Sequence, residues 1–437
     1  MIKKDVRSLS LEDLRAFFTD KGFQAFRGNQ VYEWLWKKSI TDIDQMTNIS
    51  KEIRDSLKSE FVINNIEIDS VQKSTDGTIK NAIKLHDGLT VESVLIPTKT
   101  RMTACISSQV GCSLNCKFCA TSRLKRMRNL NPDEIYDQVV TINNQCLEFH
   151  NKPLTNIVFM GMGEPLMNYN NVLKAIDKIT SPSGLGMSPK RIVVSTSGIP
   201  KMIKKMADDK VKFKLAVSLH SAIEKTRTSI MPFNEKFNLA ELRDSLKYWY
   251  KNTKNRITYE YVVWEGINDK MEDVNALVEF CKFSPSKVNL IQYNSIDDPS
   301  FKQANNSAIA LYMNILEKNN ITVTFRRSRG KDIDAACGLL STKNQQPAIP
   351  EIKTICVGNI YLGGTGKTPL TIKISQILKQ QHFKVATIKK NYSNQKDEQL
   401  LLEKKTSLII ADSRKDAISN GINEKYDILV FDDGLQD

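Results

Sequence analysis

The chain has 437 residues, and its 63 Lys and Arg residues exceed its 49 Asp and Glu residues to give a net charge of +14. Such a length exceeds what one hydrophobic core supports, so we expect at least two folding units, and a hydrophobic content of 41% excludes a disordered chain. The excess positive charge predicts a polyanionic partner.

The sequence also predicts where the protein is found. No run approaches the roughly 18 uncharged apolar residues that a membrane span requires, and the first residues lack the apolar segment of a signal peptide. We therefore expect a cytoplasmic protein without a membrane span. Thiols stay reduced in that compartment, so the eight cysteines are predicted to bind metal or act in catalysis before they form structural disulfides.

Residues 1–95 are predicted to form a small helical accessory domain that ends in short strands. Ser10 can cap a first helix, and a second amphipathic stretch rich in aromatic residues follows. The polar face of that stretch carries Arg27, Lys37 and Lys38. Basic side chains beside aromatic ones suit RNA binding, although a solvated helix face has the same composition.

Strand and helix patterns alternate over residues 96–341. Strands are predicted at Met102–Ser107, Asn156–Met160, Arg191–Ser195, Lys212–Ser218, Ile257–Val263, Lys287–Ile291 and Ile321–Arg326. Helical patterns lie between them, from Pro132–Phe149 to Ala308–Lys318. Six such βα units predict an α/β fold with a parallel sheet, either doubly wound or closed into a partial barrel. In both, functional side chains lie at the C-terminal ends of the strands.

A cysteine motif follows the first of these strands. Cys112, Cys116 and Cys119 are spaced C-x3-C-x2-C, so three thiolates can hold a [4Fe–4S] cluster and leave one iron open for another ligand. S-adenosylmethionine can bind such an iron and is then cleaved to a 5′-deoxyadenosyl radical. The alternatives are a zinc site completed by Cys105 or His86, or a C-x-x-C redox pair. We favour the cluster because a zinc ribbon usually carries a second C-x-x-C pair.

The motif resembles that of the radical S-adenosylmethionine superfamily. The residues around it resemble the adenine-C2 methyltransferases of large-subunit ribosomal RNA and transfer RNA, over about residues 10–341. The shared motifs are FRGNQVYEWLW (26–36), VESVLIP (91–97), SSQVGCSLNCKFCAT (107–121), GMGEPL (161–166), STSG (195–198), SLH (218–220), NLIQYN (289–294) and SRGKDIDAACG (328–338). This resemblance implies a partial (βα)6 radical-SAM barrel.

The resemblance also implies a role for individual residues. Cys112, Cys116 and Cys119 would be the cluster ligands. Gly163 and Glu164 would hold the amino group of S-adenosylmethionine, because a carboxylate suits an ammonium group. The remaining cofactor contacts would be Ser195, Ser218, Leu219, His220 and Asn294. GMGEPL does not meet the Rossmann fingerprint, because Leu166 stands where the third glycine is required.

Two further cysteines and a glutamate complete the implied reaction, which uses two molecules of S-adenosylmethionine per turnover. Cys337 matches the methyl-carrying cysteine, Cys105 the cysteine that resolves the covalent intermediate, and Glu92 the general base. One cofactor molecule methylates Cys337, and the radical from a second converts this methyl group to a species that adds to adenine. Glu92 then removes the ring proton, and Cys105 attacks Cys337 and leaves a disulfide.

The implied partners are 23S ribosomal RNA and transfer RNA, with flavodoxin or ferredoxin as electron donor to a monomeric enzyme. Arg123, Lys125, Arg126 and Arg128 follow the cluster motif and are expected to line the entrance for RNA phosphates, although a solvated charge run has the same pattern. Cys146 and Cys281 fall in apolar helical patterns and are predicted to be core residues.

A composition break separates the last quarter of the chain. Residues 342–350 read as a linker, and residues 351–437 as a further α/β fragment that begins with a strand at Ile352–Val357. Residues 346–437 carry 13 Lys and Arg against 11 Asp and Glu, so most of the positive charge belongs to the preceding part.

The fragment contains a loop of P-loop type. In VGNIYLGGTGKTPL (357–370), Gly364, Gly366 and Lys367 are candidates to bind phosphate and Thr368 to bind magnesium with ATP, although Tyr361 replaces the first glycine of the strict pattern. The segment resembles the tetraacyldisaccharide 4′-kinases of lipid A synthesis. In that resemblance the candidate kinase-like carboxylates are Asp397, Asp432 and Asp433.

That kinase family begins with a membrane helix and continues well past the equivalent of Asp433. We therefore expect an inactive fragment, joined to the first enzyme by fusion of neighbouring reading frames. Three alternatives remain for the whole chain. They are methylation at carbon 8 of the same adenine, a P-loop lipid A kinase with residues 1–345 as its accessory part, and a zinc-dependent RNA-binding module without catalysis.

Overall fold

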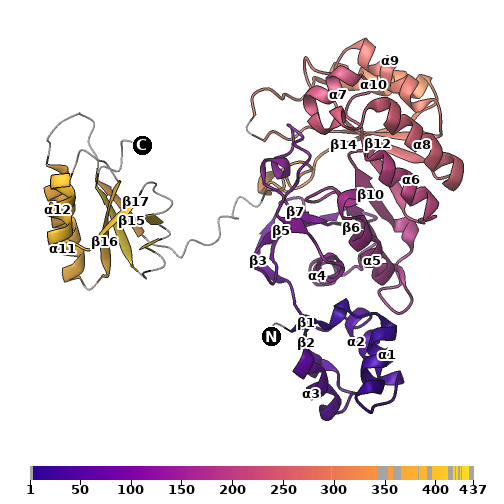
Figure 1. Cartoon of the computed structure of the whole chain (residues 1–437). Coiled ribbons are helices and arrows are strands. Elements are labelled where there is room, and N and C mark those ends of the chain that lie inside the picture. The colour runs from indigo at the N-terminus through magenta and orange to yellow at the C-terminus, as the bar shows by residue number, and fades with distance from the viewer. Residues whose placement is uncertain are drawn as a thin grey trace. The chain divides into compact units, whose positions relative to one another are not determined.

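The computed structural model of the chain (Figure 1) describes residues 3–296, 298–341, 353–357, 366–381, 383–390, 396–411, 417–418, 420–421, 424 and 426–432. It divides into two compact units, Met1–Thr342 and Lys343–Asp437. None of the helices in the described residues is long and apolar enough to cross a membrane.

The first unit begins with helices α1 (Leu11–Asp20), α2 (Phe26–Trp36) and α3 (Lys51–Glu60). As predicted, Ser10 caps α1, and it forms a capping box with Asp13. Lys38, which follows α2, packs on an aromatic ring of that helix, with its ammonium 3.5 Å from the centre of the Trp34 ring. The short parallel pair β1 (Lys4–Asp5) and β2 (Phe61–Val62) brings the two ends of this helical segment together.

The centre of the unit is one ten-stranded sheet. Its strands in spatial order are β14 (Thr322–Arg326), β13 (Ser286–Ile291), β12 (Ile257–Val262), β11 (Lys214–Ser218), β10 (Ile192–Thr196), β9 (Asn156–Phe159), β6 (Met102–Cys105), β5 (Thr90–Pro97), β4 (Ile79–Lys84) and β3 (Glu67–Lys73). Seven strands of this sheet are parallel, namely β6, β9, β10, β11, β12, β13 and β14. All seven were predicted, with bounds that differ by one or two residues. The order is linear, so the barrel is open.

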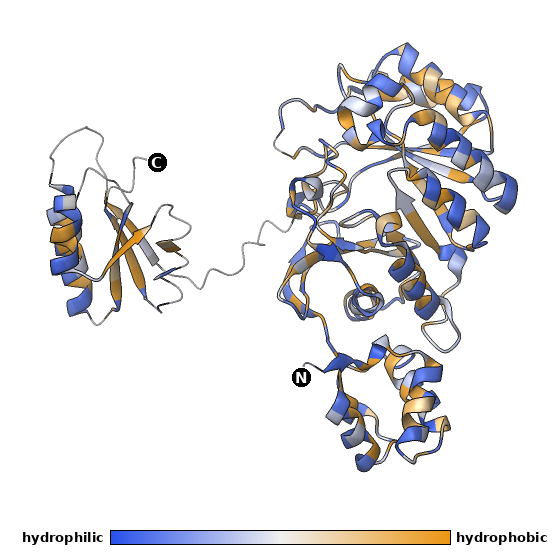
Figure 2. Ribbon diagram, viewed as in Figure 1, coloured by the Kyte–Doolittle hydropathy of each residue, from blue (hydrophilic) through white to orange (hydrophobic). Residues whose placement is uncertain are grey.

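Helices connect consecutive parallel strands and lie along the outer side of the curved sheet (Figure 1). They are α4 (Pro132–His150), α5 (Tyr169–Thr180), α6 (Pro200–Asp208), α7 (Glu224–Ile230), α8 (Leu239–Thr253), α9 (Met271–Cys281) and α10 (Asn306–Lys318). Hydrophobic residues occupy the strands and the sides of the helices that face them, as Figure 2 shows. Cys146 and Cys281 belong to this core, which confirms their prediction. The six βα units of the expected barrel are therefore present.

The boundary expected at residue 95 falls inside β5. Strands β3, β4 and β5 continue the main sheet as antiparallel strands, and Val94 of β5 pairs with Cys105 of β6. The sequence analysis assigned these strands to the N-terminal domain. They join the main sheet because the outer edge of β6 would otherwise expose unpaired backbone groups.

The second unit contains a four-stranded parallel sheet in the order β15 (Lys353–Val357), β18 (Ile428–Asp432), β16 (Val385–Lys390) and β17 (Leu408–Ala411). Helices α11 (Lys367–Gln380) and α12 (Lys396–Lys405) accompany it. A strand followed by a helix thus flanks the predicted phosphate loop. Residues 358–365, among them Gly364, as well as Asp433 and the linker 342–350, lie outside the described residues.

Candidate active site

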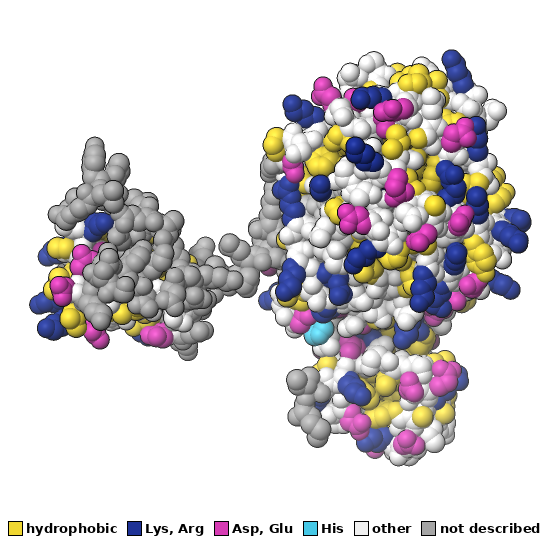
Figure 3. Space-filling model, turned by 45° about the horizontal axis from the view of Figure 1, so that its top comes forward, with side chains coloured by type: hydrophobic (Ala, Val, Ile, Leu, Met, Phe, Trp, Pro, Cys, Tyr) yellow, Lys and Arg dark blue, Asp and Glu magenta, His cyan; other side chains and the backbone are white. Residues whose placement is uncertain are grey.

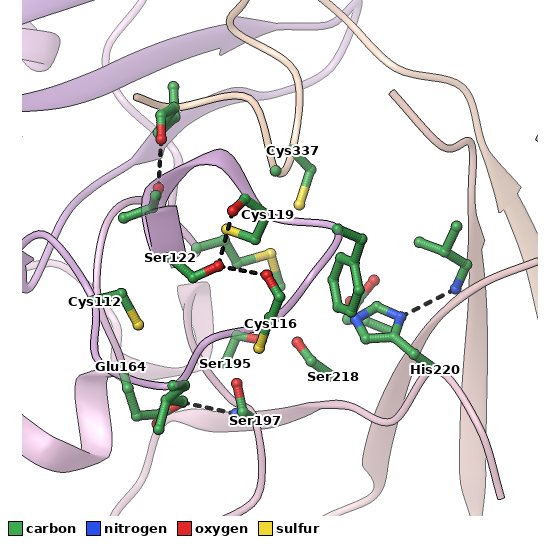
Figure 4. Close-up of a pocket in the computed structure, with 18 of the residues that line it drawn as sticks. Cys112, Cys116, Cys119, Ser122, Glu164, Ser195, Ser197, Ser218, His220 and Cys337 are labelled. Atoms are coloured by element: carbon green, nitrogen blue, oxygen red, sulfur yellow. Dashed lines mark hydrogen bonds between the residues drawn. The ribbon is translucent and has the colours of Figure 1, made fainter. Parts of the chain in front are cut away.

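The three predicted cluster cysteines lie on one loop beyond the C-terminal end of β6. The loop runs from the short strand β7 (Gln109–Val110) to the 3₁₀ helix η3 (Ala120–Arg123). Cys112, Cys116 and Cys119 all line one cavity at this end of the sheet. Figure 4 shows them around a common space. The sequence analysis predicted this location from the rule for parallel sheets.

Short-range contacts fix the shape of the loop. Gly111 has a φ of +73°, and a Cβ atom there would lie 2.4 Å from the carbonyl oxygen of Lys125, so this position requires glycine. The Ser122 hydroxyl lies 2.8 Å from the carbonyl oxygen of Cys119 and also contacts that of Cys116 (Figure 4). These contacts fix the backbone of the loop that carries the three cysteines.

The cysteine thiols fit a metal cluster. Burial raises the pKa of Cys112 to about 11 and that of Cys116 well above the usual value, so neither forms a thiolate readily without metal. Within the described residues, no group of three or more His, Cys, Asp or Glu side chains surrounds a single metal ion. A cubane cluster instead binds each cysteine at a separate corner. His86, a candidate zinc ligand, contacts Glu134 with 3.3 Å between Nδ1 and Oε1.

The GMGEPL segment forms another wall of this cavity. Gly163 has a φ of +90°, and a Cβ atom there would lie 2.4 Å from the Cβ of Gln109. The buried Glu164 carboxylate accepts hydrogen bonds from the backbone N–H groups of Ser197 (2.8 Å) and Leu166 (3.1 Å). Burial raises the pKa of Glu164, and the Ser197 N–H opposes that rise. A cationic ligand would offset the cost of burying this carboxylate, so the site suits an ammonium group.

Strand ends supply the next group of predicted contacts. Ser195 of β10, Ser218 of β11 and Asn294 after β13 all line the cavity. The Asn294 Nδ2 donates to the carbonyl oxygen of Cys337 at 3.1 Å, whereas its Oδ1 is buried without a partner among the described residues. Such an atom is suited to accept a hydrogen bond from a ligand. Leu219 is fully buried in the core, and the residues that line the cavity do not include it.

His220 lies on the cavity wall as a neutral ring. It has a φ of +56°, and its Nδ1 accepts a hydrogen bond from the backbone N–H of Val262 at 3.2 Å. Burial lowers its pKa to about 3. The rings of Phe118 and Trp264 lie 4.8 and 5.8 Å from it. Sequence reasoning did not find this aromatic group, because its members come from three separate segments.

The two cysteines assigned to methyl transfer come together in the structure. Cys337 lines the main cavity with the cluster cysteines and also lines a second cavity that it shares with Cys105 and Arg326. Burial raises the pKa of Cys105 to about 12, and the Cys337 thiol also contributes to that rise. Cys337 is exposed as a residue, but burial of its thiol raises its pKa to about 11. All eight cysteines are free thiols.

Glu92 is buried in β5, the strand that pairs with β6, which carries Cys105. It lines neither the main cavity nor the second cavity that Cys105 and Cys337 share. Its Oε1 lies 3.6 Å from the Nζ of Lys80, which also donates to the carbonyl oxygen of Asp334 at 3.5 Å. Its Oε2 has no hydrogen-bond partner among the described residues. Burial raises the pKa of Glu92, and the Lys80 ammonium opposes this rise. Sequence reasoning did not find Lys80.

The turn between β3 and β4 anchors the segment that precedes Cys337. The Asp332 carboxylate accepts a hydrogen bond from the Ser74 hydroxyl at 2.6 Å, across 258 residues of sequence. The backbone N–H of Gly330 donates to the Asp76 carboxylate at 3.0 Å. No local pattern reports contacts over such a separation, so sequence reasoning missed this anchor.

Of the basic residues expected at the entrance, Arg128 has a different role. Its guanidinium forms two hydrogen bonds, at 2.8 and 2.7 Å, with the Glu134 carboxylate of α4. Lys125 and Arg126 are exposed, and neither they nor Arg123 lines the main cavity. On the face of the first unit that Figure 3 shows, basic side chains are interspersed with acidic ones. The role expected of these residues at an RNA entrance stays a prediction, and the pairing of Arg128 with Glu134 is a contact that a charge run does not reveal.

In the second unit, the structure brings some of the kinase-like residues together. The Asp432 carboxylate accepts hydrogen bonds from the hydroxyl of Thr368 at 3.0 Å and the Nζ of Lys389 at 2.9 Å. Gly366 has a φ of +77° and precedes Lys367, the first residue of α11. Asp397 is exposed in the first turn of α12.

The fold and site define a class of protein. The model of the radical SAM superfamily matches residues 106–281, and the model of the ribosomal RNA large subunit methyltransferase N-terminal domain matches residues 4–63. A radical SAM methyltransferase from Sphaerobacter thermophilus has a crystal structure with a TM-score of 0.74 and 33% identity, over 78% of this chain and 100% of that one. Residues of the first unit thus form a radical SAM enzyme, a class that implies a [4Fe–4S] cluster and S-adenosylmethionine.

Sequence relatives define the particular family. The probable dual-specificity RNA methyltransferase RlmN of Christiangramia forsetii is 67% identical over 342 residues, which are 78% of this chain and 97% of that protein. The protein of the same name from Flavobacterium johnsoniae is 64% identical over 79% of this chain and 99% of its own length. The chain belongs to the RlmN family of RNA methyltransferases.

The second unit has a separate match. The model of the tetraacyldisaccharide-1-P 4′-kinase matches residues 337–437, which is less than a quarter of the chain. This match agrees with the resemblance of the GGTGKTP segment.

Proposed function

We propose that residues 1–341 methylate carbon 2 of an adenosine in 23S ribosomal RNA and in transfer RNA, with Cys337 as the methyl carrier. One observation carries this proposal: Cys337 lines both the cavity of the cluster cysteines and the cavity of Cys105. A group carried on Cys337 can therefore be activated on one side and released on the other. The shared RNA methyltransferase family supports the substrate class.

The roles of the other residues follow from their chemistry. The bound cluster and S-adenosylmethionine supply the 5′-deoxyadenosyl radical. Cys112, Cys116 and Cys119 hold the cluster, and the buried Glu164 carboxylate orients the amino group of the cofactor. The polar groups at the strand ends hold the rest of the cofactor, with the unpaired Asn294 Oδ1 as an acceptor.

Glu92 removes the ring proton, which requires an ionised carboxylate. Burial raises its pKa toward the range of a useful base, while the Lys80 ammonium keeps it ionised. Cys105 then attacks the sulfur of Cys337, releases the methylated base and leaves a disulfide. An external reductant reopens this bond.

The test of this function uses full-length protein, anaerobically reconstituted and supplied with reductant. Wild type is expected to form 2-methyladenosine in both RNAs, identified by mass spectrometry against standards of 2- and 8-methyladenosine. Cys337→Ala is expected to form neither, and Cys105→Ala to accumulate a covalent protein–RNA adduct. 8-Methyladenosine as the product would establish the alternative regiochemistry. Methylated adenosine from Cys337→Ala would contradict the assignment of the methyl carrier.

The proposal extends to partners and location. The electron donor is a flavodoxin or ferredoxin, the enzyme acts as a monomer in the cytoplasm, and the substrate RNA must present its adenine unstacked. For the second unit we infer no lipid A kinase activity, although its loop residues are of the kind that bind ATP and magnesium. Phosphorylation of a lipid A precursor by the purified chain would contradict it.

A further inference from the structure

Arg227 of α7 is a fully buried cation beside the cofactor cavity. Within the described residues, no carboxylate lies within ion-pair distance of its guanidinium, which instead bonds to neutral oxygens. Burial lowers its pKa to about 10, which leaves it charged at neutral pH. Burial of an unpaired charge in a protein interior is unfavourable, so we expect this residue to have a function.

The guanidinium joins the ends of two neighbouring strands. It donates to the carbonyl oxygen of Ser197 after β10 at 2.5 Å and to that of Ser218 in β11 at 3.1 Å. It also donates to the carbonyl oxygen of Leu219. The N–H of Ser197 binds Glu164, and Ser218 lines the cavity. Arg227 therefore holds the backbone on which the proposed contacts to S-adenosylmethionine are built.

The same segment contacts the cluster loop. At the end of α7, the carbonyl oxygen of Ile230 accepts a hydrogen bond from the backbone N–H of Lys117, which follows Cys116, at 3.0 Å. Ile230, Met231 and Cys116 pack in one hydrophobic cluster, and the guanidinium donates to the Met231 sulfur at 3.3 Å. These contacts connect the guanidinium to the cluster loop through the end of α7.

We propose that Arg227 is a positioning residue that holds the ends of β10 and β11 against the cluster loop and supplies a buried positive charge that favours the reduced cluster. This inference rests on the cluster site of the proposed function. Reduction adds one negative charge to a cluster that already carries three thiolates. A nearby cation in a dry interior stabilises that charge and makes the midpoint potential less negative.

The proposal gives Leu219 a role although its side chain does not line the cavity. Leu219 contributes its carbonyl oxygen to the Arg227 fork, and its side chain packs in the core. Its role is therefore carried by the backbone. An arginine is required at position 227 because its planar fork can donate to several oxygens at once, which a lysine cannot do.

The test is the midpoint potential of the cluster, measured by EPR during anaerobic redox titration of full-length reconstituted protein. Arg227→Met removes the charge and is expected to make the potential more negative. Arg227→Lys keeps the charge and is expected to keep the potential close to wild type. Glu224→Gln removes the carboxylate that opposes the Arg227 charge, so the potential should become less negative. Arg243→Met, which removes an arginine packed on Phe280, is the control and should leave it unchanged.

Binding of S-adenosylmethionine supplies the second measurement. Arg227→Lys and Arg227→Met should both bind it at least tenfold more weakly, because neither can hold all three carbonyl oxygens. An unchanged potential in Arg227→Met overturns the proposal; if that variant takes up no cluster, an unchanged potential in Glu224→Gln does so. No cluster signal from wild type would refute the proposed function as well, whereas a normal wild-type signal with unchanged variants refutes this proposal alone.

Discussion

Arg7 attaches the N-terminal helices to α4 through a buried group of charges. Its guanidinium donates to both oxygens of Asp137 at 2.9 and 2.8 Å and lies 3.3 Å from Asp133 and 3.1 Å from Asp5. The Arg7 side chain is 3% exposed. We expect Arg7→Ala to lower the free energy of unfolding by more than the removal of an exposed ion pair does.

The expected magnitude follows from the burial. Removing one partner of a buried ion pair costs about 3–5 kcal/mol, because the remaining charge stays buried. Protonation of the carboxylates limits this cost, since burial already raises the pKa of Asp133 to about 7. Without Arg7, the folded state binds protons that the unfolded state does not, so stability falls as pH rises. We therefore expect a loss of about 3 kcal/mol at pH 8 and a smaller loss at pH 5.

Urea unfolding of the full chain, followed by tryptophan fluorescence at both pH values, measures this effect. Lys21→Ala is the matched control, because its ion pair with Glu60 has both side chains more than two-fifths exposed. Exposed pairs contribute about 0–1 kcal/mol. An Arg7→Ala protein that loses no more stability at pH 8 than Lys21→Ala does would refute the reasoning.

Three further predictions concern the site. Gly163→Ala should weaken S-adenosylmethionine binding at least tenfold, because the new Cβ would lie 2.4 Å from the Cβ of Gln109 and the φ of +90° disfavours any side chain. Calorimetry measures this affinity, and a wild-type value would contradict the prediction. Lys80→Met should move the acidic limb of the methylation pH profile, on which the rate rises with pH, to higher pH, since loss of the ammonium raises the pKa of Glu92; an unmoved limb would exclude Glu92 as the base. Asp332→Ala should lower RNA methylation several-fold while reductive cleavage of S-adenosylmethionine continues, because only the Cys337 segment is released; equal loss of both would argue against a local effect.

The sequence could predict the elements that repeat along the chain. Each parallel strand is a short apolar run followed by an amphipathic helix, so β9 and α4 were found within one residue of their ends. Ser195 and Ser218, which the family resemblance implied, line the cavity at the C-terminal ends of such strands, where the rule for parallel sheets expects functional groups.

Features that depend on contacts between distant segments could not be predicted. Helix α7 has seven residues with few apolar positions, so its periodicity is too weak to detect. The buried roles of Arg227 and Lys80 depend on neighbours from other strands, and a charged residue in sequence gives no sign of burial. The pairing of Arg128 with Glu134 is hidden for the same reason.

The segment after the last cluster ligand is hydrogen-bonded to the loop of the methyl carrier. The backbone N–H of Ala120 donates to the carbonyl oxygen of Gly338 at 2.8 Å, and the Thr121 hydroxyl donates to that of Leu340 at 2.5 Å. These bonds join the segment that carries the last cluster ligand to the segment that carries the methyl carrier. A substitution that shifts one of these two segments is therefore expected to displace the other, so the spacing between cluster and methyl carrier is set by the protein backbone.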